Sequence, residues 1–349
     1  MATRKWKLTS KDVEEPLSEE TVNTLQEIKT ALTYGEVIGL PTETVYGLAG
    51  NATNSEAIHK IFIAKGRPGD NPLIVHIHDV SQIEKFTEPV HENVKKLMDA
   101  FWPGPISFIL PLKGGYIASN VVAELDSIAV RMPSHPVARK VLQYVDVPLA
   151  APSANLSGKP SPTNATHVYD DLAEKIYGVI ESEPAEYGLE STVLDCTRFP
   201  YRIARPGAIS AQAIRSVLQS DIERHQDMSE RPISPGMKYK HYAPQQPLIV
   251  FLGGINSNTK FEVEDKNQKI GVIAPETMRQ YVDEDIRFVS LCKDEHSYRE
   301  ASKNLYAALR FMDNSDADVI FIYGFPINDE TEALMNRIYK ATGDFLIKG

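Results

Sequence analysis

Hydrophobic residues up to about position 220 recur with two spacings, one typical of helices and one of strands. Spacings of three and four predict helices, which alternate with short apolar runs that predict strands. The helices are expected over 18–34, 54–66, 93–101, 137–145 and 208–218, and the strands over 36–40, 72–77, 106–112, 127–132, 148–151 and 191–194. This mixture indicates an α/β or α+β domain, in which polar residues directly after strands are candidates for a site.

The periodicity stops at 226–247, a segment that contains four prolines and is typical of an extended connector. Beyond it the pattern resumes, with strands expected over 248–251, 270–274, 288–291 and 319–323 and helices over 298–312 and 331–341. We therefore predict two α/β domains, a first over residues 1–225 and a smaller Rossmann-like one over 248–349, joined by a linker at 226–247.

Composition agrees with two folded domains and limits what the chain can bind. A length of 349 residues exceeds one ordinary core, and a net charge of −10 opposes a general grip on nucleic acid, so any RNA contact would be weak and local. Two cysteines far apart give neither a metal-binding pair nor a disulfide framework. No apolar run is long enough to span a bilayer, and we expect a cytoplasmic protein without membrane contact.

Several motifs of well-known enzyme classes are absent from the sequence. There is no GxGxxG, and the segment 158–161 lacks the spacing of a P-loop, which argues against a Walker-type ATPase. Neither GxSxG nor HExxH occurs, so a serine hydrolase or a zincin is not supported. His76 and His78 share one face of a predicted strand, but two histidines without a third ligand seldom bind a metal.

Four polar clusters follow the predicted strands instead. Three are continuous, at 41–48, 65–72 and 150–161, and the fourth combines Ser127 and Arg131 with residues 190–192 and 205–207. Each also has a simpler explanation, as a polar turn, as cations that stabilise a helix C-terminus by about 0.3–1 kcal/mol, or as a connector.

The clusters contain side chains suited to charged ligands. Arg67 and Asn71 each adjoin a proline that stiffens the loop, and they suit phosphate oxygens and a base or ribose. Arg131 lies within an apolar strand and needs a partner, either an internal carboxylate such as Glu43 or a ligand carboxylate. Both partners remain open at this point.

Taken together and in order, these segments closely resemble the YrdC/Sua5/YwlC family of threonylcarbamoyl-AMP synthases. The resemblance continues through 234–244, which is similar to the Sua5 linker, into a C-terminal Sua5 domain, so the chain resembles the long, two-domain form. The matching segments of the first domain are PTETVYGL at 41–48, KGRPGDNPLIVHI at 65–77, SIAVRMP at 127–133, APSANLSGKPSPT at 151–163, EST at 190–192 and ARPG at 204–207.

The resemblance implies a YrdC-like twisted mixed sheet, mostly parallel and partly antiparallel, with a concave basic cavity that holds ATP and L-threonine side by side. The positions that match the family's L-threonine contacts are Thr44, His76, Arg131, Ala151 and Ser191. Those that match its ATP contacts are Arg67, Asn71, Ser127, Ser153, Ser161, Arg205 and Tyr242. Lys65 and Asn155 are expected to assist at the phosphates, and Lys65, Arg67 and Arg205 to act as the catalytic charges.

The implied reaction converts L-threonine, bicarbonate and ATP into threonylcarbamoyl-AMP and pyrophosphate. A carbamate of threonine would attack the α-phosphorus of ATP, with Mg²⁺ bound mainly through the nucleotide. The product would pass to the downstream tRNA-threonylcarbamoyl transferase machinery, which modifies a tRNA adenosine. The linker would fold over the first domain as a lid, with Tyr242 against ATP.

Two other classes remain as alternatives. An RNA-binding module of the same fold would show a broad basic face and would lack the threonine-contacting residues, whereas this acidic chain keeps them. An enzyme that uses carbamoyl phosphate within a larger maturation protein would carry zinc-finger-like cysteine sets, which this sequence lacks.

Overall fold

The computed structural model describes residues 2–224, 242–254, 261, 263, 265, 267–342 and 346–347. The chain divides into two compact units. Residues 239–349, together with 158–160 and 187–189, belong to the second unit, and the remainder belongs to the first. Most of the predicted linker at 226–247 lies outside the described residues.

One large mixed sheet forms the centre of the first unit, with the strand order β1-β8-β2-β3-β7-β4-β6-β5-β9-β10-β11. Its ten neighbouring pairs among the described residues are five parallel and five antiparallel. The sheet is thus mixed as predicted, but parallel pairs do not predominate, because short connections such as 41–46 reverse the chain. The strands are β1 (Arg4–Lys7), β2 (Ile38–Leu40), β3 (Gly47–Asn51), β4 (Ile74–His76), β5 (Ile106–Pro111), β6 (Ser127–Arg131), β7 (Leu149–Ala150), β8 (Gly178–Glu181), β9 (Thr192–Asp195), β10 (Arg202–Arg205) and β11 (Glu223–Arg224).

The helices of this unit begin and end close to the predicted positions. Ser18 and Asn54 cap the first two helices through their side chains, and Gly35 and Gly66 follow them with positive φ angles of 78° and 59°. The helical elements are α1 (Glu19–Thr33), α2 (Ser55–Lys65), η1 (Val80–Lys85), α3 (Glu92–Phe101), α4 (Ser119–Val122), α5 (Pro136–Val145), α6 (Ala165–Leu172) and α7 (Ala211–Leu218).

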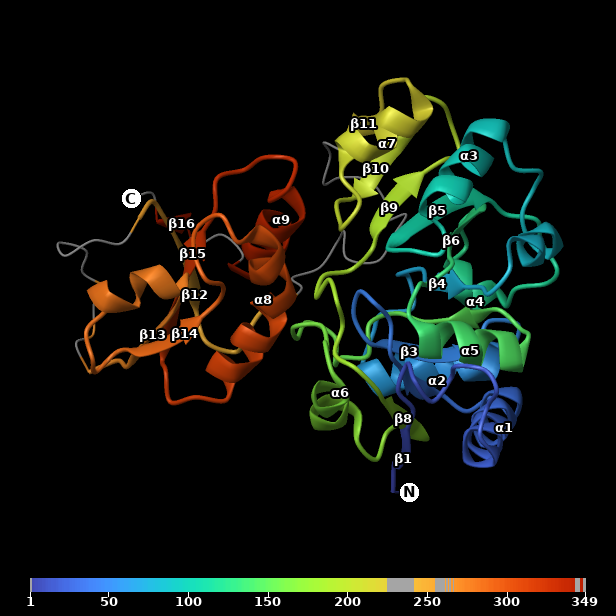
Figure 1. Ribbon diagram of the computed structural model, residues 1–349, viewed down its shortest axis with the longest axis horizontal. Helices are drawn as coiled ribbons and strands as arrows, with labels where there is room; N and C mark the ends of the chain where they lie inside the picture. The colour runs from blue at the N-terminus through green and yellow to red at the C-terminus, as the bar shows by residue number, and fades with distance from the viewer. Residues whose placement is uncertain are drawn as a thin grey trace. The chain divides into compact units, whose positions relative to one another are not determined.

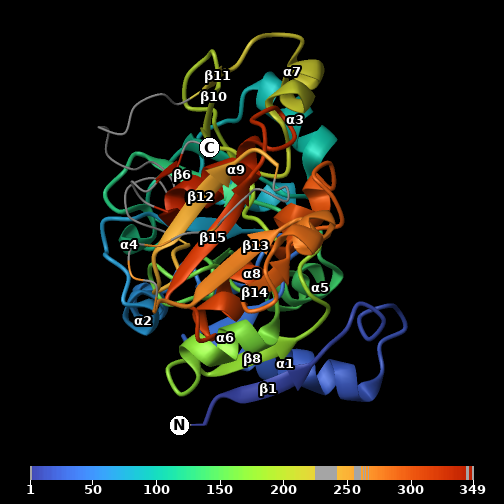
Figure 2. The same ribbon diagram turned by 90° about the vertical axis from the view of Figure 1, so that its left-hand side faces the viewer.

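The two faces of the sheet are covered differently. On one face, α2, α3, α6 and α7 contribute to one large apolar core, and α3 and α7 lie side by side at the end of the sheet far from α1 (Figures 1 and 2). On the other face, α1 and α5 pack over the half formed by β1, β8, β2, β3 and β7. Apolar side chains from the other half form a small separate cluster that includes no helical residue, namely Ile74, Ile109, Ala129, Val193 and Ala204.

The second unit is an α/β layer built on a parallel sheet with the order β14-β13-β15-β12-β16, and strands β12, β15 and β13 are seen side by side in Figure 2. In Figure 1, α8 and α9 lie together on one side of this sheet. The Rossmann-like layer was predicted, although β15 lies between β12 and β13, unlike the usual 3-2-1-4-5 order. Its elements are β12 (Leu248–Leu252), β13 (Ile270–Ala274), η2 (Glu276–Tyr281), β14 (Arg287–Ser290), α8 (Tyr298–Asp313), β15 (Val319–Gly324), α9 (Glu332–Thr342) and β16 (Leu346–Ile347).

A few elements of the first unit were not predicted from the pattern. Strands β1, β3 and β8 and helix α6 are short, and β3 (GLAGN) contains no β-branched residue. These strands depend on their neighbours in the sheet, because β3 lies between β2 and β7 and β8 lies between β1 and β2.

Two expectations from the sequence concern the cysteines and membrane-spanning segments. Cys196 and Cys292 are both buried free thiols. None of the described helices is both long and apolar enough to cross a membrane.

Candidate active site

A row of three polar side chains crosses the half of the sheet face that carries the small apolar cluster. His76 on β4 is paired in register with Arg131 on β6, which is paired in turn with Ser107 on β5. Residues paired in this way project to the same face of a sheet. All three are buried, with at most 4% of their surface exposed. Such a row in an apolar sheet needs polar partners or a ligand.

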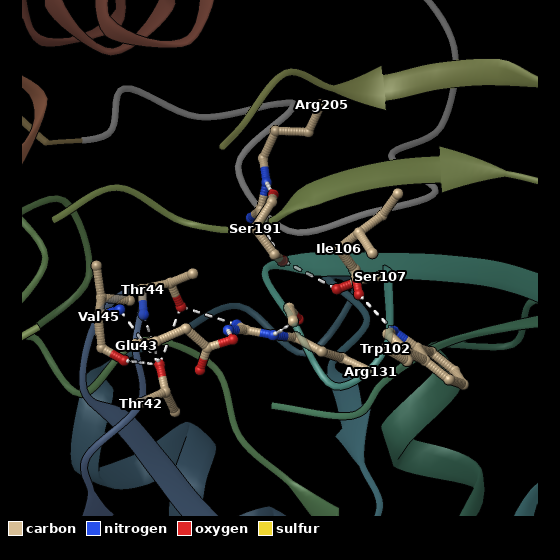
Figure 3. Close-up of polar contacts among 11 residues, drawn as sticks. Thr42, Glu43, Thr44, Val45, Trp102, Ile106, Ser107, Arg131, Ser191 and Arg205 are labelled. Atoms are coloured by element: carbon tan, nitrogen blue, oxygen red, sulfur yellow. Dashed lines mark hydrogen bonds and ion pairs between the residues drawn. The ribbon is translucent and has the colours of Figure 1, made fainter. Parts of the chain in front are cut away.

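Arg131 is held from three directions (Figure 3). Its Nη2 lies 2.6 Å from Oε1 of Glu43, and its Nη1 donates to Oγ1 of Thr44 at 2.8 Å. Its Nε donates to the carbonyl of Gly104 at 3.3 Å. Of the two partners that the sequence left open for Arg131, the internal carboxylate is therefore present, and the ligand carboxylate stays a prediction.

The turn between β2 and β3 positions these partners. Thr42 Oγ1 donates to the carbonyl of Val45 at 2.6 Å and lies 2.9 Å from Oγ1 of Thr44. The backbone N–H of Tyr46 donates to the carbonyl of Pro162 at 2.8 Å. These bonds fix the turn so that Glu43 and Thr44 both face the guanidinium (Figure 3).

A second group joins Ser191, just before β9, to Arg205 at the end of β10. Arg205 Nη2 donates to the carbonyl oxygen of Ser191 at 2.9 Å and to its Oγ at 3.1 Å, and Nε donates to the same carbonyl at 3.1 Å. The Oγ of Ser191 also lies 2.9 Å from the Oγ of Ser107 (Figure 3). Ser107 thus connects this group to the polar row.

Lys65 connects the end of α2 to the loop after β7. Its Nζ donates to the backbone carbonyls of Ser153 at 2.5 Å and Asn155 at 2.6 Å, and the lysine is almost fully buried. This cation therefore orders a loop that the family resemblance assigns to ATP. Its predicted contact with phosphate is not tested by these bonds.

Three more predicted ATP residues lie in these loops. Arg67 Nη2 donates to the carbonyls of Asn71 at 3.4 Å and Pro72 at 3.2 Å. The side-chain oxygen of Asn71 is buried and accepts no hydrogen bond within the described part of the chain, which suits a ligand donor. Ser161 donates to the carboxylate of Glu190 at 2.6 Å.

Ala151 and Ser127 complete the predicted set in the first unit. Ala151 is buried, and its backbone N–H donates to the carbonyl of Ile74 on the neighbouring strand. Ser127 is buried on β6, four positions before Arg131 and therefore on the same face. The predicted contacts of Ala151 with threonine and of Ser127 with ATP stay predictions.

The electrostatic states of the row follow from its burial. Burial, with Arg131 adding to it, lowers the pKa of His76 from its usual 6.5 to about 3, so its imidazole is neutral at pH 7. Burial alone would raise the pKa of Glu43, but Arg131 outweighs it with help from backbone N–H groups, and the pKa is lowered. The site therefore holds an ionised arginine and glutamate beside a neutral histidine.

Tyr242 belongs to the second unit and packs against residues of that unit. Its ring centroid is 5.3 Å from that of Tyr306, and the Arg337 guanidinium lies 5.7 Å from the ring centre. The side chain is buried. Its contact with ATP stays a prediction.

Three contributors to the site were not assigned from the sequence: Ser107, the carbonyl of Gly104, and Glu190. A signal existed for Ser107, which is the one polar residue in the apolar run 106–110. No sequence signal identifies a backbone carbonyl as a partner. Within the described residues, no group of three His, Cys, Asp or Glu side chains is arranged to hold a metal ion.

Fold and site together define an α/β protein with a buried cluster of charged and polar side chains on a mixed sheet and a second parallel-sheet domain. The family model Sua5_yciO_yrdC, described as telomere recombination, matches residues 30–207. A second model, described as threonylcarbamoyl-AMP synthase, C-terminal domain, matches residues 209–343. The chain belongs to the Sua5/YciO/YrdC family, in its two-domain form.

Individual relatives agree with this membership. The threonylcarbamoyl-AMP synthase of Bacillus subtilis is 41% identical over 352 residues, which cover the whole of both chains. The crystal structure of Pyrococcus abyssi Sua5 complexed with L-threonine matches with a TM-score of 0.88 at 36% identity, covering 99% of this chain and 100% of that one. A Mycobacterium tuberculosis relative is 32% identical over 191 residues, which are 55% of this chain and 87% of the relative.

Proposed function

We propose that the protein is a nucleotidyltransferase that makes threonylcarbamoyl-AMP from L-threonine, bicarbonate and ATP, for modification of a tRNA adenosine. The observation that carries the proposal is the contact between Ser191 and Arg205. Ser191 matches a threonine-contacting position of the family, and Arg205 matches an ATP-contacting position. Three hydrogen bonds join the two residues. A reaction that joins threonine to the α-phosphate of ATP needs the two substrates this close.

The threonine subsite is proposed on the polar row. Arg131 binds the carboxylate as a charge-assisted pair, through the N–H groups not directed at Glu43, Thr44 or Gly104. Thr44, the neutral His76 and Ser191 read the hydroxyl. Ala151 leaves room for the methyl group. The P. abyssi relative was crystallised with L-threonine, and its similarity to the chain supports the presence of a threonine site.

The ATP subsite is proposed on the loops that follow α2, β7 and β10. Lys65, Arg67 and Arg205 neutralise the phosphates, and the buried side-chain oxygen of Asn71 accepts a hydrogen bond from the nucleotide. The remaining contacts come from Ser127, Ser153, Asn155 and Ser161, with Tyr242 predicted to join them from the second unit.

The chemistry requires no covalent intermediate on the protein. The ammonium group of threonine gives a proton to bicarbonate, which loses water to become CO2. The neutral amine then bonds to CO2 and releases a proton, and the carbamate oxygen attacks the α-phosphorus while the bond to pyrophosphate breaks. The protein contributes proximity and positive charge, which stabilise the phosphoryl oxygens as charge develops on the leaving group. Mg²⁺ is proposed to arrive with ATP, held mainly by the phosphate oxygens of the nucleotide.

Incubation of the protein with ATP, L-threonine and labelled bicarbonate tests the proposal. We expect pyrophosphate release that depends on both threonine and bicarbonate, together with label in an adenylate product. Release that is indifferent to threonine would rule out the proposed function. A protein that binds RNA tightly but releases no pyrophosphate would instead favour an RNA-binding module of the same fold.

A further inference from the structure

Glu43 is a buried acid to which the proposed function gives no role. Its carboxylate is 3% exposed and lies against Arg131, with Oε1 2.6 Å from Nη2 (Figure 3). The backbone N–H groups of Glu43 and Ser134 lie close enough to help lower its pKa, but neither carboxylate oxygen has a hydrogen bond of good geometry from the described residues. A buried carboxylate normally accepts several such bonds, so this one retains capacity for a further donor.

Stability does not explain why such a pair is present. Removing two charges from water costs several kcal/mol per ion, and a buried ion pair is often no more stabilising than apolar residues of the same volume. The pair lies beside the small cluster of Ile74, Ala129 and their neighbours, where apolar side chains would pack readily. A ligand that uses both charges supplies the missing reason.

An α-amino acid is such a ligand. It carries a carboxylate and an ammonium group on a single carbon atom, so a site with adjacent positive and negative groups complements both ends. Arg131 has five N–H groups, and its contacts with Gly104, Thr44 and Glu43 use one on each of its three nitrogens. Within the described part of the chain, one N–H on Nη1 and one on Nη2 remain for a ligand. Those two N–H groups suit a carboxylate, and the carboxylate of Glu43 beside them suits the ammonium.

We propose that Glu43 binds the α-amino group of the amino-acid substrate while Arg131 binds its carboxylate. This inference rests on the proposed function, since it concerns the same threonine subsite. Glu43 is then a specificity-determining residue that accepts only substrates with an amine on the α-carbon. The contact also orients the nitrogen atom that forms the bond to CO2 after the ammonium group has given up a proton to bicarbonate.

The rigid turn around Glu43 makes the contact specific. Thr42 bonds to Val45 and Thr44 within the turn, and Arg131 fixes Thr44, so the carboxylate is held in place before a ligand binds. Preorganised charges bind without the cost of ordering flexible side chains. The alternative is that Glu43 only neutralises Arg131 and never touches the substrate.

Binding of analogues to the unaltered protein separates these two roles. Calorimetry in the presence of a non-hydrolysable ATP analogue would compare L-threonine with 2,3-dihydroxybutanoate, in which a hydroxyl replaces the amine. We expect the hydroxy acid to bind at least about tenfold more weakly. Equal binding of the two would overturn the inference while leaving the proposed function intact. If L-threonine itself does not bind, the proposed function fails and this inference with it.

A variant gives the second test. In Glu43→Gln the affinity for L-threonine should fall by at least about tenfold, whereas that for 2,3-dihydroxybutanoate should stay the same or rise. If the carboxylate serves only as the counterion of Arg131, its replacement should lower both affinities by the same factor. That result would overturn the inference. Glu36→Gln is the matched control, because Glu36 pairs with Lys60 at the surface and both affinities should be unchanged. Should Glu43→Gln fail to fold, the analogue comparison on the unaltered protein decides.

Discussion

At the scale of single residues, the cations of the site are held by protein groups before any substrate is bound. Arg131 contacts Glu43, Thr44 and Gly104, Lys65 donates to two backbone carbonyls, and Arg205 donates to Ser191. Charges fixed in this way need little reorganisation when negative charge develops, which is the main advantage of a preorganised site.

Arg67 is the cation whose role is most easily tested by mutation. Arg67→Ala should lower kcat/KM for ATP by about 100-fold, equivalent to about 2.7 kcal/mol, because a charge-assisted contact with phosphate is lost. Its melting temperature should change little, since Arg67 is a half-buried loop residue and its bonds to the carbonyls of Asn71 and Pro72 are long. The matched control is Arg198→Ala, which removes an exposed arginine from the turn between β9 and β10. A collapsed melt with unchanged activity per folded molecule would show instead that Arg67 stabilises the helix terminus.

His76 should make the stability of the first unit depend on pH in a defined direction. Its folded-state pKa of about 3 lies below the usual 6.5, so between these values the unfolded chain binds a proton that the native state does not. Its contribution to stability is fully present above about pH 6.5 and is lost as the pH falls toward 3. Between pH 6.5 and 3, the free energy of unfolding of His76→Asn should therefore fall less steeply than that of the parent, by about 1.4 kcal/mol per pH unit. Denaturant titrations of both proteins from pH 7 to pH 4 measure it, and parallel curves would contradict the prediction.

Recognition of the substrate hydroxyl should produce a specific order of selectivity. Thr44, His76 and Ser191 are proposed to bond it, and a site built for a hydroxyl rejects analogues without one more strongly than analogues without a methyl group. Valine should therefore be used less than serine, and serine less than threonine. Pyrophosphate release with each amino acid at matched concentration measures the order. Equal turnover of the three would show that the pocket is assigned wrongly.

At the scale of elements, close approach of the loop after β10 to the start of β9 sets the position of Ser191. A Cβ atom on Gly207 would lie 2.2 Å from the backbone nitrogen of Thr192 and 2.5 Å from the carbonyl carbon of Ser191. Any side chain there must push the two segments apart, and Ser191 with Arg205 would move with them.

Substitution of that glycine should affect stability and catalysis together. Gly207→Ala is expected to cost about 1–3 kcal/mol of unfolding free energy through overpacking, and to reduce kcat/KM for both ATP and threonine. Gly114→Ala is the control, because nothing lies within 4 Å of its added Cβ and the variant should behave as the parent. Urea unfolding and initial rates measure both effects. Unchanged kinetics in Gly207→Ala would show that the position of Ser191 matters less than proposed.

At the scale of the whole molecule, the question is what the second unit and the linker add. The M. tuberculosis relative aligns over 87% of its length with 55% of this chain, so a relative of little more than half the length exists. The family resemblance assigns the linker a lid role with Tyr242 against ATP, and a lid would exclude water from a hydrolysable adenylate.

Removal of residues 226–349 tests the lid. We expect a folded first domain with a raised KM for ATP and more ATP hydrolysed per molecule of product. Tyr242→Ala should reproduce part of this loss, and Tyr242→Phe, which keeps the ring that packs against Tyr306, should reproduce less. A truncated domain that equals the full chain in KM and in product per ATP consumed would leave the linker as a spacer.

The sequence by itself determined the elements whose stability is mostly local. Helices α1 and α2 were predicted to within a residue or two, because Ser18 and Asn54 cap them and Gly35 and Gly66 end them through short-range bonds. Strands β12, β13 and β15 of the second unit were likewise visible as apolar runs, whereas the two-residue β16 was not predicted. The ordered motifs also gave the family, since each motif is short but their order is specific.

Tertiary structure alone decided which distant groups meet. Strand β3 was missed because its Gly-Leu-Ala-Gly-Asn sequence has no intrinsic preference for a strand, and only its pairing with β2 and β7 makes it one. The register of β4, β6 and β5 placed Ser107 beside Arg131, and a turn 87 positions away along the chain supplied Thr44. Local patterns carry no information about such contacts, because their free energy appears only when the sheet forms and water is excluded.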